Sequence, residues 1–443
     1  MPETVDGKMG VWMTSALVVG TIIGAGIFML PVSLAPLGAN ALIGWVVSGV
    51  GAVCIAFALA QFSRFGGEGI QANIEREFGP TVGFLVTWAF WFSNWVAQAS
   101  VAVAAGSTLS FIGPWFGGGS VIPVAIGCVV VLTAINALGV RASGGLSIAT
   151  VAIKVLPLLA VVWLFLDRGV SGGHYEPLAP ARVDFSNLST ATALTFFALT
   201  GFENATAPVS KVRNPHRTLT RALLGGTAFA AFVFLAAGTS IQMLLPAHVV
   251  ATSSAPFAAA IASDWGRGAA SLAALAITVS AIGCLNCLLL GTGELGYSMA
   301  LRGDLPAVMA RTRGANTPVV SQSVAAGLTV LLLLANGGRG TAALYTFVVL
   351  LSTAGVIVLY VVGVLAAFKS TPTIGGRAII LVALLFSVFA LYGTGLEADL
   401  WCLVLLLVGL AVRAVVRHLS SRSLNGSSPP LEASPTALPE SSS

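Results

Sequence analysis

Charged residues are scarce in this chain of 443 residues: only 8% are Asp, Glu, Lys or Arg, against about a quarter in an ordinary soluble protein. Hydrophobic residues make up 56% of the sequence, and its mean hydropathy is +0.94. These values exclude a soluble globular fold and indicate an all-α polytopic membrane protein. The basic isoelectric point, near 9.1, does not indicate nucleic-acid binding, because the basic residues are scattered rather than gathered in one patch.

Catalytic and metal-binding patterns are also missing. The sequence contains no phosphate-binding loop, no Gly-x-Ser-x-Gly elbow and no His-Glu-x-x-His pair, and its loops are too short for a soluble catalytic domain. None of the histidines falls in an apolar run, whereas all five cysteines do. We therefore predict that the chain is not an enzyme and holds no cofactor or metal. Cys284 and Cys287, one helical turn apart, are interpreted as small packing residues.

Long apolar runs are what the sequence has in abundance. They predict twelve membrane-spanning helices near residues 11–36, 40–63, 83–112, 119–140, 146–166, 189–210, 219–244, 268–300, 319–336, 341–368, 376–394 and 399–418. Residues 1–10 form an N-terminal segment, 11–418 the twelve-helix membrane domain, and the Ser/Pro-rich stretch 419–443 a disordered tail.

The basic residues predict the orientation of these helices. With the N-terminus in the cytoplasm, the inner loops and termini carry most of the Lys and Arg residues, whereas the outer loops hold only Arg168, Arg182, Arg267 and Arg339. This asymmetry satisfies the positive-inside rule. It predicts a multi-pass protein of the inner (cell) membrane with both termini in the cytoplasm, as an even number of spans requires.

The first apolar run contains an unusual break, Gly20-Thr21-Ile22-Ile23-Gly24-Ala25-Gly26-Ile27-Phe28. Each glycine costs about 1 kcal/mol relative to alanine inside a helix. Non-helical backbone at membrane depth is tolerated only where it lines a cavity within the protein. The N-terminus of a half-helix exposed there would bind a carboxylate. We therefore expect a carrier for a small anionic or zwitterionic solute.

The sixth run contains a second break, Phe196-Phe197-Ala198-Leu199-Thr200-Gly201-Phe202-Glu203-Asn204. Two interrupted spans, the first and the sixth, are what a five-plus-five inverted repeat produces, with one repeat over about 11–166 and the other over about 189–368. Residues 376–418 would add helices eleven and twelve. The alternative is that the glycines only let helices pack closely.

Ionisable residues inside predicted spans include Lys154, Glu203 and Glu294, and each of these is a functional candidate because a charge in a membrane is costly. Lys154 lies about eight residues into its helix, roughly 12 Å deep. It either exchanges a proton during transport or is a permanently charged strut, and both interpretations stay open. Glu203 either caps freed amides or couples protonation to gating, which we favour. For Glu294 we favour a structural or solvated role.

These motifs resemble those of a known family. The stretch from Gly20 to Phe28 with Pro31 is similar to the first-helix signature of the amino acid–polyamine–organocation (APC) transporters. Phe197 to Glu203, followed by the basic segment 211–217, resembles their sixth-helix motif. The likeness extends over roughly residues 10–415, and the branch it suggests is that of the bacterial basic amino acid/polyamine antiporters.

The resemblance implies twelve helices around a central amino acid site. The amides of Gly24, Ala25 and Gly26 would receive the substrate carboxylate, and Gly201 would be a hinge. The residues whose carbonyls would receive the α-amino group are Ile22, Phe197, Ala198 and Thr200. Lys154 matches a fifth-helix lysine of proton-linked and exchanging members, at a position that binds sodium in related carriers. Relatives of the arginine–agmatine antiporter lack that lysine, which argues against close kinship with them.

The function that we predict is secondary active transport of L-amino acids, neutral in side chain, by alternating access. Transport would be sodium-independent and proton-linked or exchanging, with an amino acid, protons and the lipid bilayer as partners. A cationic amino acid/polyamine antiporter and a neutral amino acid exporter are the alternatives. A passive channel is disfavoured because the spans carry only isolated polar residues. The oligomeric state cannot be predicted from these features.

Overall fold

The computed structural model describes residues 10–24, 26–64, 70–113, 121–138, 144–203, 215–313 and 317–425. These residues form helices and connections, and no β-strand occurs among them. The helices of the first half are α1 (Val11–Ile22), α2 (Gly26–Leu34), η1 (Ala35–Leu37), α3 (Ala39–Ala60), η2 (Gln61–Arg64), α4 (Ile70–Phe78), α5 (Pro80–Ile112), α6 (Ile122–Ala137) and α7 (Gly144–Val170). Those of the second half are α8 (Phe185–Leu199), α9 (Pro215–Leu244), α10 (Ala247–Thr252), α11 (Pro256–Leu301), η6 (Ala307–Ala310), α12 (Val319–Ala335), η7 (Gly337–Arg339), α13 (Thr341–Ser370) and α14 (Ile374–Asn425).

Within the described residues, six helices are long and apolar enough to cross a membrane. The bent pair formed by α1 with the helix from Gly26 to Leu37 adds a seventh candidate, and α6, α8 and α12 are shorter apolar helices. The fold is therefore that of an all-helical protein with several membrane spans. The count of twelve spans and the inverted repeat stay predictions.

Glycine residues divide the two longest helices. Gly266 in α11 has φ +77° and Gly395 in α14 has φ +82°, values in the left-handed region that favours glycine. Gly395 separates residues 374–394 from 396–425, close to the predicted spans 376–394 and 399–418. The part of α11 before Gly266 and the short helix α10 were not predicted, because they lie outside the long apolar runs.

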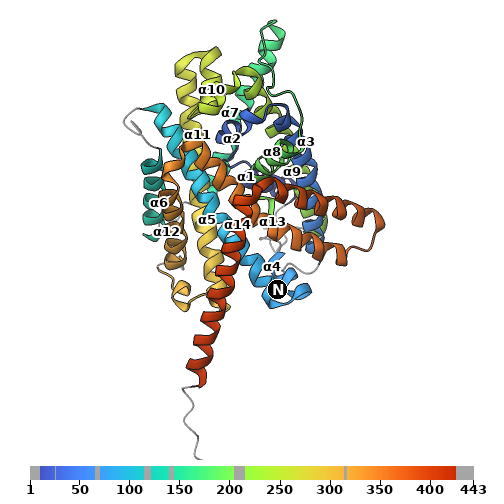
Figure 1. Ribbon diagram of the computed structural model, residues 1–443, viewed down its shortest axis with the longest axis vertical. Coiled ribbons are helices and arrows are strands. Elements are labelled where there is room, and N and C mark those ends of the chain that lie inside the picture. Colours follow the sequence, from blue (N-terminus) through green and yellow to red (C-terminus); the bar gives the residue numbers. More distant parts are fainter. Residues whose placement is uncertain are drawn as a thin grey trace, which may run out of the picture.

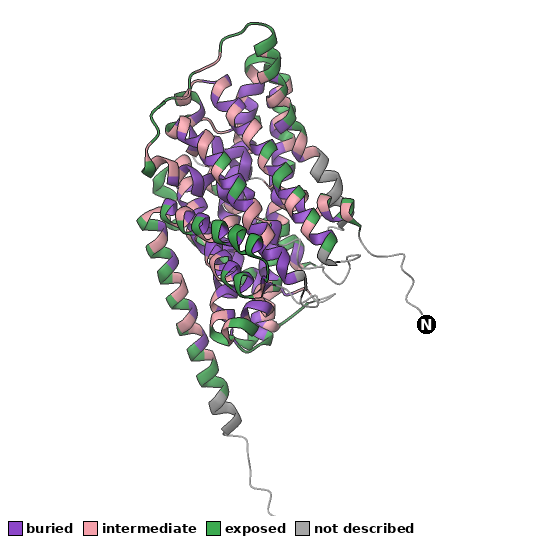
Figure 2. Ribbon diagram, turned by 90° about the vertical axis from the view of Figure 1, so that its right-hand side faces the viewer, coloured by how far each residue is buried: buried purple, intermediate pink, exposed green. Residues whose placement is uncertain are grey.

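The helices form an elongated bundle (Figure 1), in which α5 packs against α11 and α13 while α3 packs against α8 and α9. Buried residues concentrate inside this bundle (Figure 2). We call the end with α4 and the last turns of α14 the inner end, and the end with α10 the outer end. The positive-inside pattern predicts that the inner end faces the cytoplasm.

Hydrogen bonds between side chains join three helices in the middle of the bundle. Gln98 of α5 donates through Nε2 to Thr292 Oγ1 of α11 at 2.9 Å, and its Oε1 accepts from Thr329 Oγ1 of α12 at 3.0 Å. All three side chains are buried. Because every polar atom named here has a partner, this group holds α5, α11 and α12 in fixed register. Helix α2, which follows the first break, packs against α5 and α11 of this group.

At the inner end, a buried ion pair joins α14 to the chain after α11. Arg413 Nε donates to Asp304 Oδ1 at 2.7 Å, and both side chains are 7% exposed. Arg413 also donates to the Pro80 carbonyl at 3.0 Å, and Arg417 approaches the same carboxylate oxygen at 3.1 Å. The last part of α14 is therefore fastened to the start of α5.

The structure changes two predicted boundaries. Helix α8 ends at Leu199, so the predicted span 189–210 stops being helical at the second break. Helix α14 continues to Asn425, so residues 419–425 are helical rather than part of a disordered tail. The Ser/Pro-rich composition predicts disorder from the residue where the apolar face of the last span ends, but α14 continues beyond the end of that face. Residues 426–443 lie outside the described residues.

Candidate functional site

The first apolar run is divided into two helices at the Gly-Ala-Gly segment. Helix α1 ends at Ile22, and α2 begins at Gly26 with its axis turned by 47°. The Gly24 N–H bonds to the Ile22 carbonyl at 2.7 Å, a tight turn that ends the first helix. The first N–H groups of α2 have no partner within their own helix, as at any helix start. Ala25, one of the predicted carboxylate-binding residues, lies outside the described residues.

The second break follows the end of α8. Thr200 has an extended backbone with ψ 164°, and Gly201 has φ +111°, so neither residue continues the helix. The Thr200 N–H and hydroxyl both donate to the Phe197 carbonyl, at 3.2 and 2.7 Å. Phe197 and Ala198 are buried in the last turn of α8. The backbone therefore opens at the position where the sequence predicts the hinge.

The two breaks lie against each other. A Cβ atom on Gly201 would be 2.6 Å from the carbonyl oxygen of Thr21, in the last turn of α1. A Cβ atom on Gly26 would be 2.9 Å from Cε1 of Phe197, in the last turn of α8. Each of these glycines therefore permits an approach that no other residue allows. The structure brings Ile22, Gly24, Gly26, Phe197, Thr200 and Gly201 into one region.

Glu203 has its side chain turned back onto the second break. Its Oε2 atom accepts a hydrogen bond from the Gly201 N–H at 3.0 Å and from the Tyr360 hydroxyl at 2.7 Å. The carboxylate is 6% exposed, and the ring of Tyr360 stacks on Phe202 at 5.5 Å between centroids. A buried carboxylate needs such donors, because an unsatisfied one is costly. Glu203 thus caps a freed amide, as one of its two interpretations requires.

Helix α13 contacts both breaks through tyrosine hydroxyl groups. Tyr345 donates to the Gly26 carbonyl at 2.5 Å, at the start of α2, and Tyr360 donates to Glu203 beside the second break. Both tyrosines are fully buried. Sequence reasoning missed them, although a phenol in an apolar span is a signal because its hydroxyl requires a partner. Their hydrogen bonds fix the two breaks to a single helix.

Lys154 lies on α7 with its side chain 8% exposed. The Lys154 charge is close enough to act on the thiol of Cys287 in α11. Within the described residues, Lys154 makes no hydrogen bond or ion pair. Cys284, one turn before Cys287, reaches the first break: a Cβ on Gly24 would be 3.2 Å from its Sγ. Cys284 therefore lies beside the first break, and Cys287, one turn further along α11, lies within the electrostatic reach of Lys154.

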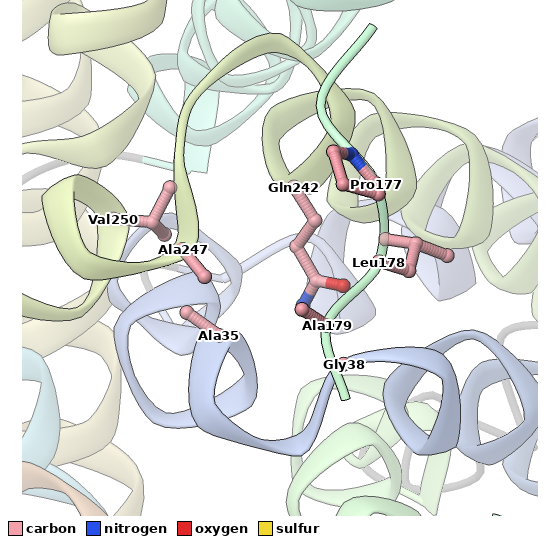
Figure 3. Close-up of a pocket in the computed structure, with 8 residues that line it drawn as sticks. All are labelled: Ala35, Gly38, Pro177, Leu178, Ala179, Gln242, Ala247 and Val250. Carbon is pink, nitrogen blue, oxygen red and sulfur yellow. The ribbon is translucent and has the colours of Figure 1, made fainter. Parts of the chain in front are cut away.

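An aromatic pair joins α2 to α11 after the first break. The ring of Phe28 in α2 packs edge-on against Phe257 of α11, with centroids 5.2 Å apart, and both side chains are buried. A small pocket lies between η1, the end of α9, α10 and the 177–179 segment (Figure 3). The Gln242 amide points into it, and its Nε2 has no hydrogen-bond partner. No metal-binding group of three or more His, Cys, Asp or Glu residues occurs among the described residues.

Comparison with known proteins places this architecture in a family. A profile described as "Amino acid permease" matches residues 9–408, which is most of the chain. The chain belongs to the amino acid permease family. It is therefore a membrane transport protein of the APC superfamily, as the two helix-break motifs predicted.

Relatives of known transport activity resemble the chain over much of its length. The cadaverine/lysine antiporter of Escherichia coli (strain K12) is 27% identical over 346 residues, covering 76% of this chain and 77% of the relative. The putrescine transporter PotE of the same strain is 26% identical over 439 residues, covering 94% and 98%. PotE of Haemophilus influenzae is 25% identical over 431 residues, covering 93% and 98%. All three are transporters, and the branch is that of the basic amino acid/polyamine antiporters.

Proposed function

We propose that this chain is a sodium-independent secondary transporter of L-amino acids that works by alternating access in the inner membrane, with both termini in the cytoplasm. The observation that carries the proposal is the contact between the two breaks, at Gly201 with Thr21 and at Gly26 with Phe197. Two interrupted helices meeting inside a membrane bundle provide unpaired backbone groups of both signs. Twelve spans with a five-plus-five inverted repeat are part of this proposal.

The substrate carboxylate binds the N–H groups of Gly24, Ala25 and Gly26. For this, the Gly24 N–H must exchange its present partner, the Ile22 carbonyl, for the carboxylate. This location is supported by the start of α2 at Gly26, because helix N-termini favour anions. The α-amino group binds carbonyl oxygens at the ends of α1 and α8, namely those of Ile22, Phe197, Ala198 and Thr200. The Ile22 carbonyl accepts the Gly24 N–H, and its second lone pair can accept another donor. The Phe197 carbonyl already accepts both the N–H and the hydroxyl of Thr200, so it must exchange one of them for the α-amino group.

Gating and coupling depend on the charged groups next to the breaks. Glu203 holds the Gly201 amide, so a change in its protonation alters the hydrogen bonds that fix the hinge. Lys154 supplies a buried positive charge near the first break, where related carriers bind sodium, and so removes the need for that ion. Both of its interpretations, proton exchange and a permanent strut, predict sodium-independent transport. Only proton exchange predicts that Lys154→Ala abolishes the response to a pH gradient.

A neutral side chain is the substrate class that the local charges support. Lys154 repels a cationic side chain, and the Glu203 carboxylate is already engaged by Gly201 and Tyr360. The relatives favour the second candidate, a cationic amino acid/polyamine antiporter, because their printed substrates are cadaverine, lysine and putrescine. The closed contact of Phe28 with Phe257 supports the assignment of this conformation to a state that is sealed at the outer end.

The test is counterflow uptake into proteoliposomes that contain the purified protein. A panel of labelled substrates is compared: alanine, leucine, serine, lysine, arginine and putrescine, each in sodium and in choline medium. The proposal predicts saturable uptake of a neutral amino acid that is equal in both media. Preference for lysine, arginine or putrescine would establish the second candidate instead. Uptake that does not saturate would indicate a passive channel and overturn both.

A further inference from the structure

One side of α11 carries exposed residues although the helix packs against α5, α7 and α12. Cys284, Cys287, Gly291 and Glu294 recur at intervals of three or four residues, which places them on a single side of the helix. Cys287, Gly291 and Glu294 are exposed and Cys284 is half-buried, whereas Leu285 between them is fully buried. The prediction that both cysteines are packing residues is therefore wrong for Cys287.

The contacts of the two thiols show what this face is turned towards. Cys284 Sγ reaches the backbone of Gly24 in the first break, and Cys287 lies within the field of the Lys154 ammonium. Asn286, on another side of α11, accepts a hydrogen bond from Asn136 of α6 at 2.8 Å. The cysteines therefore lie between the first break and α7. This face of α11 carries Glu294 and lies near Lys154 of α7. It is unsuited to contact with lipid, because ionisable groups are costly there.

The spacing of the thiols suits a reagent that binds two sulfur atoms at once. Helical residues three apart have Cβ atoms about 5–6 Å from each other, so rotation about χ1 can bring the two Sγ atoms together. Lys154 is more than nine-tenths buried, has no recorded partner in the described part of the chain, and lies next to Cys287.

We propose that Cys284 and Cys287 form a dithiol site for trivalent arsenicals at the first break, and that its occupation arrests transport. An arsenoxide forms two As–S bonds, and its oxygen leaves as one water molecule with the two thiol protons. No atom changes oxidation state. Both sulfur atoms belong to α11, so the bound arsenical acts by its bulk: it fills the space between Cys284 and Gly24 and hinders rearrangement of the half-helices. This last step rests on the proposed function, whereas formation of the adduct does not.

The chemical test counts thiols on the full-length protein. Phenylarsine oxide is added, excess reagent is removed, and the remaining thiols are alkylated under denaturing conditions and counted by intact mass. The count should fall from the five cysteines of the chain to three. Peptide mapping should place one arsenical on the segment that contains both Cys284 and Cys287. A count that stays at five, or an adduct on another cysteine, overturns the proposal.

Matched variants identify the pair. Cys284→Ala and Cys287→Ala should each keep all four of their thiols, because a single thiol does not hold the arsenical. Cys54→Ala and Cys402→Ala should each still lose two. Loss of two thiols from Cys284→Ala would contradict the assignment. Mapping of the unaltered protein decides the matter even if a variant fails to fold.

The functional test uses counterflow uptake in proteoliposomes. Phenylarsine oxide should reduce uptake by about tenfold or more, 2,3-dimercaptopropanol should restore it, and a monothiol at equal thiol concentration should not. Full adduct formation with undiminished uptake would overturn the arrest of transport. If the protein transports no amino acid, the proposed function fails, and the thiol count still decides the dithiol site.

Discussion

Two glycines at the breaks, Gly201 and Gly26, occupy positions where a side chain would meet a neighbouring group. Gly201 needs a left-handed backbone and also faces the Thr21 carbonyl, so two independent constraints fall on one position. Gly26 needs space for the Phe197 ring. These glycines were predictable, because a glycine inside a long apolar run costs helix stability and so indicates an interruption. The contact between the two breaks, Gly201 with Thr21 and Gly26 with Phe197, was expected only from the pairing of the interrupted spans.

Gly201→Ala should lower the rate of transport more than it lowers the stability of the folded protein. The left-handed conformation costs a non-glycine residue about 1–3 kcal/mol, and the new Cβ would push on the Thr21 carbonyl. We expect the rate of counterflow uptake to fall by about tenfold or more. Gly225→Ala in α9 is the matched control, since its Cβ would meet open space, and it should transport as the unaltered protein does. Equal rates for the two variants would show that Gly201 is not a hinge.

Tyr360→Phe tests the hydrogen bond that fixes Glu203. The change removes one donor from a buried carboxylate and keeps the ring that stacks on Phe202. Loss of such a partner costs about 1–3 kcal/mol. We expect a lower unfolding temperature in detergent and slower uptake, with a changed pH dependence of uptake. Tyr392→Phe, at an exposed ring, should change none of these quantities; an identical profile for Tyr360→Phe would remove Glu203 from gating.

Tyr345, Tyr360 and Cys284 were not predicted as parts of the site. Each acts through a contact between residues far apart in the chain, such as Tyr345 with Gly26. A sequence pattern shows which residues share one face of a helix. It does not show which residues of another helix that face contacts. The predicted neighbours Ile22, Gly24, Phe197 and Thr200 were accessible because they surround breaks that are visible locally.

At the scale of elements, apolar runs predicted the helices well and their ends less well. The runs 319–336 and 341–368 closely match α12 (Val319–Ala335) and α13 (Thr341–Ser370). Helices α4 and α10 were missed because they are short and, in α4, polar enough to lie outside a span. The end of α8 depends on backbone geometry at Thr200 and Gly201, which hydropathy does not report.

The attachment of α14 at the inner end predicts a stability effect. Asp304→Asn leaves the buried Arg413 without its charged partner, and breaking a buried pair costs about 3–5 kcal/mol. We expect a clear fall of the unfolding temperature in detergent. Glu75→Gln is the control: its 3.8 Å contact with Arg302 is exposed, and such pairs contribute about 0–1 kcal/mol. Equal unfolding temperatures for the two variants would contradict a structural role of the buried pair.

At the scale of the whole molecule, composition was enough to predict a polytopic membrane protein, and the two broken-helix motifs were enough to predict the family. The substrate class was not accessible in the same way. It depends on the shape and charge of a site built from several helices, and the charges near Lys154 and the substrates of the relatives favour different answers. The function of the molecule thus depends on what the paired breaks bind.

Competition in counterflow tests that binding most directly. Uptake of the preferred labelled amino acid is measured against three unlabelled competitors with the same side chain: the amino acid, its methyl ester, and the corresponding amine without a carboxylate. Because the start of α2 is proposed to hold the carboxylate and the ends of α1 and α8 the ammonium, only the intact amino acid should compete, by about a hundredfold over the others. Equal competition by the ester or by the amine would contradict a zwitterion held between the two breaks.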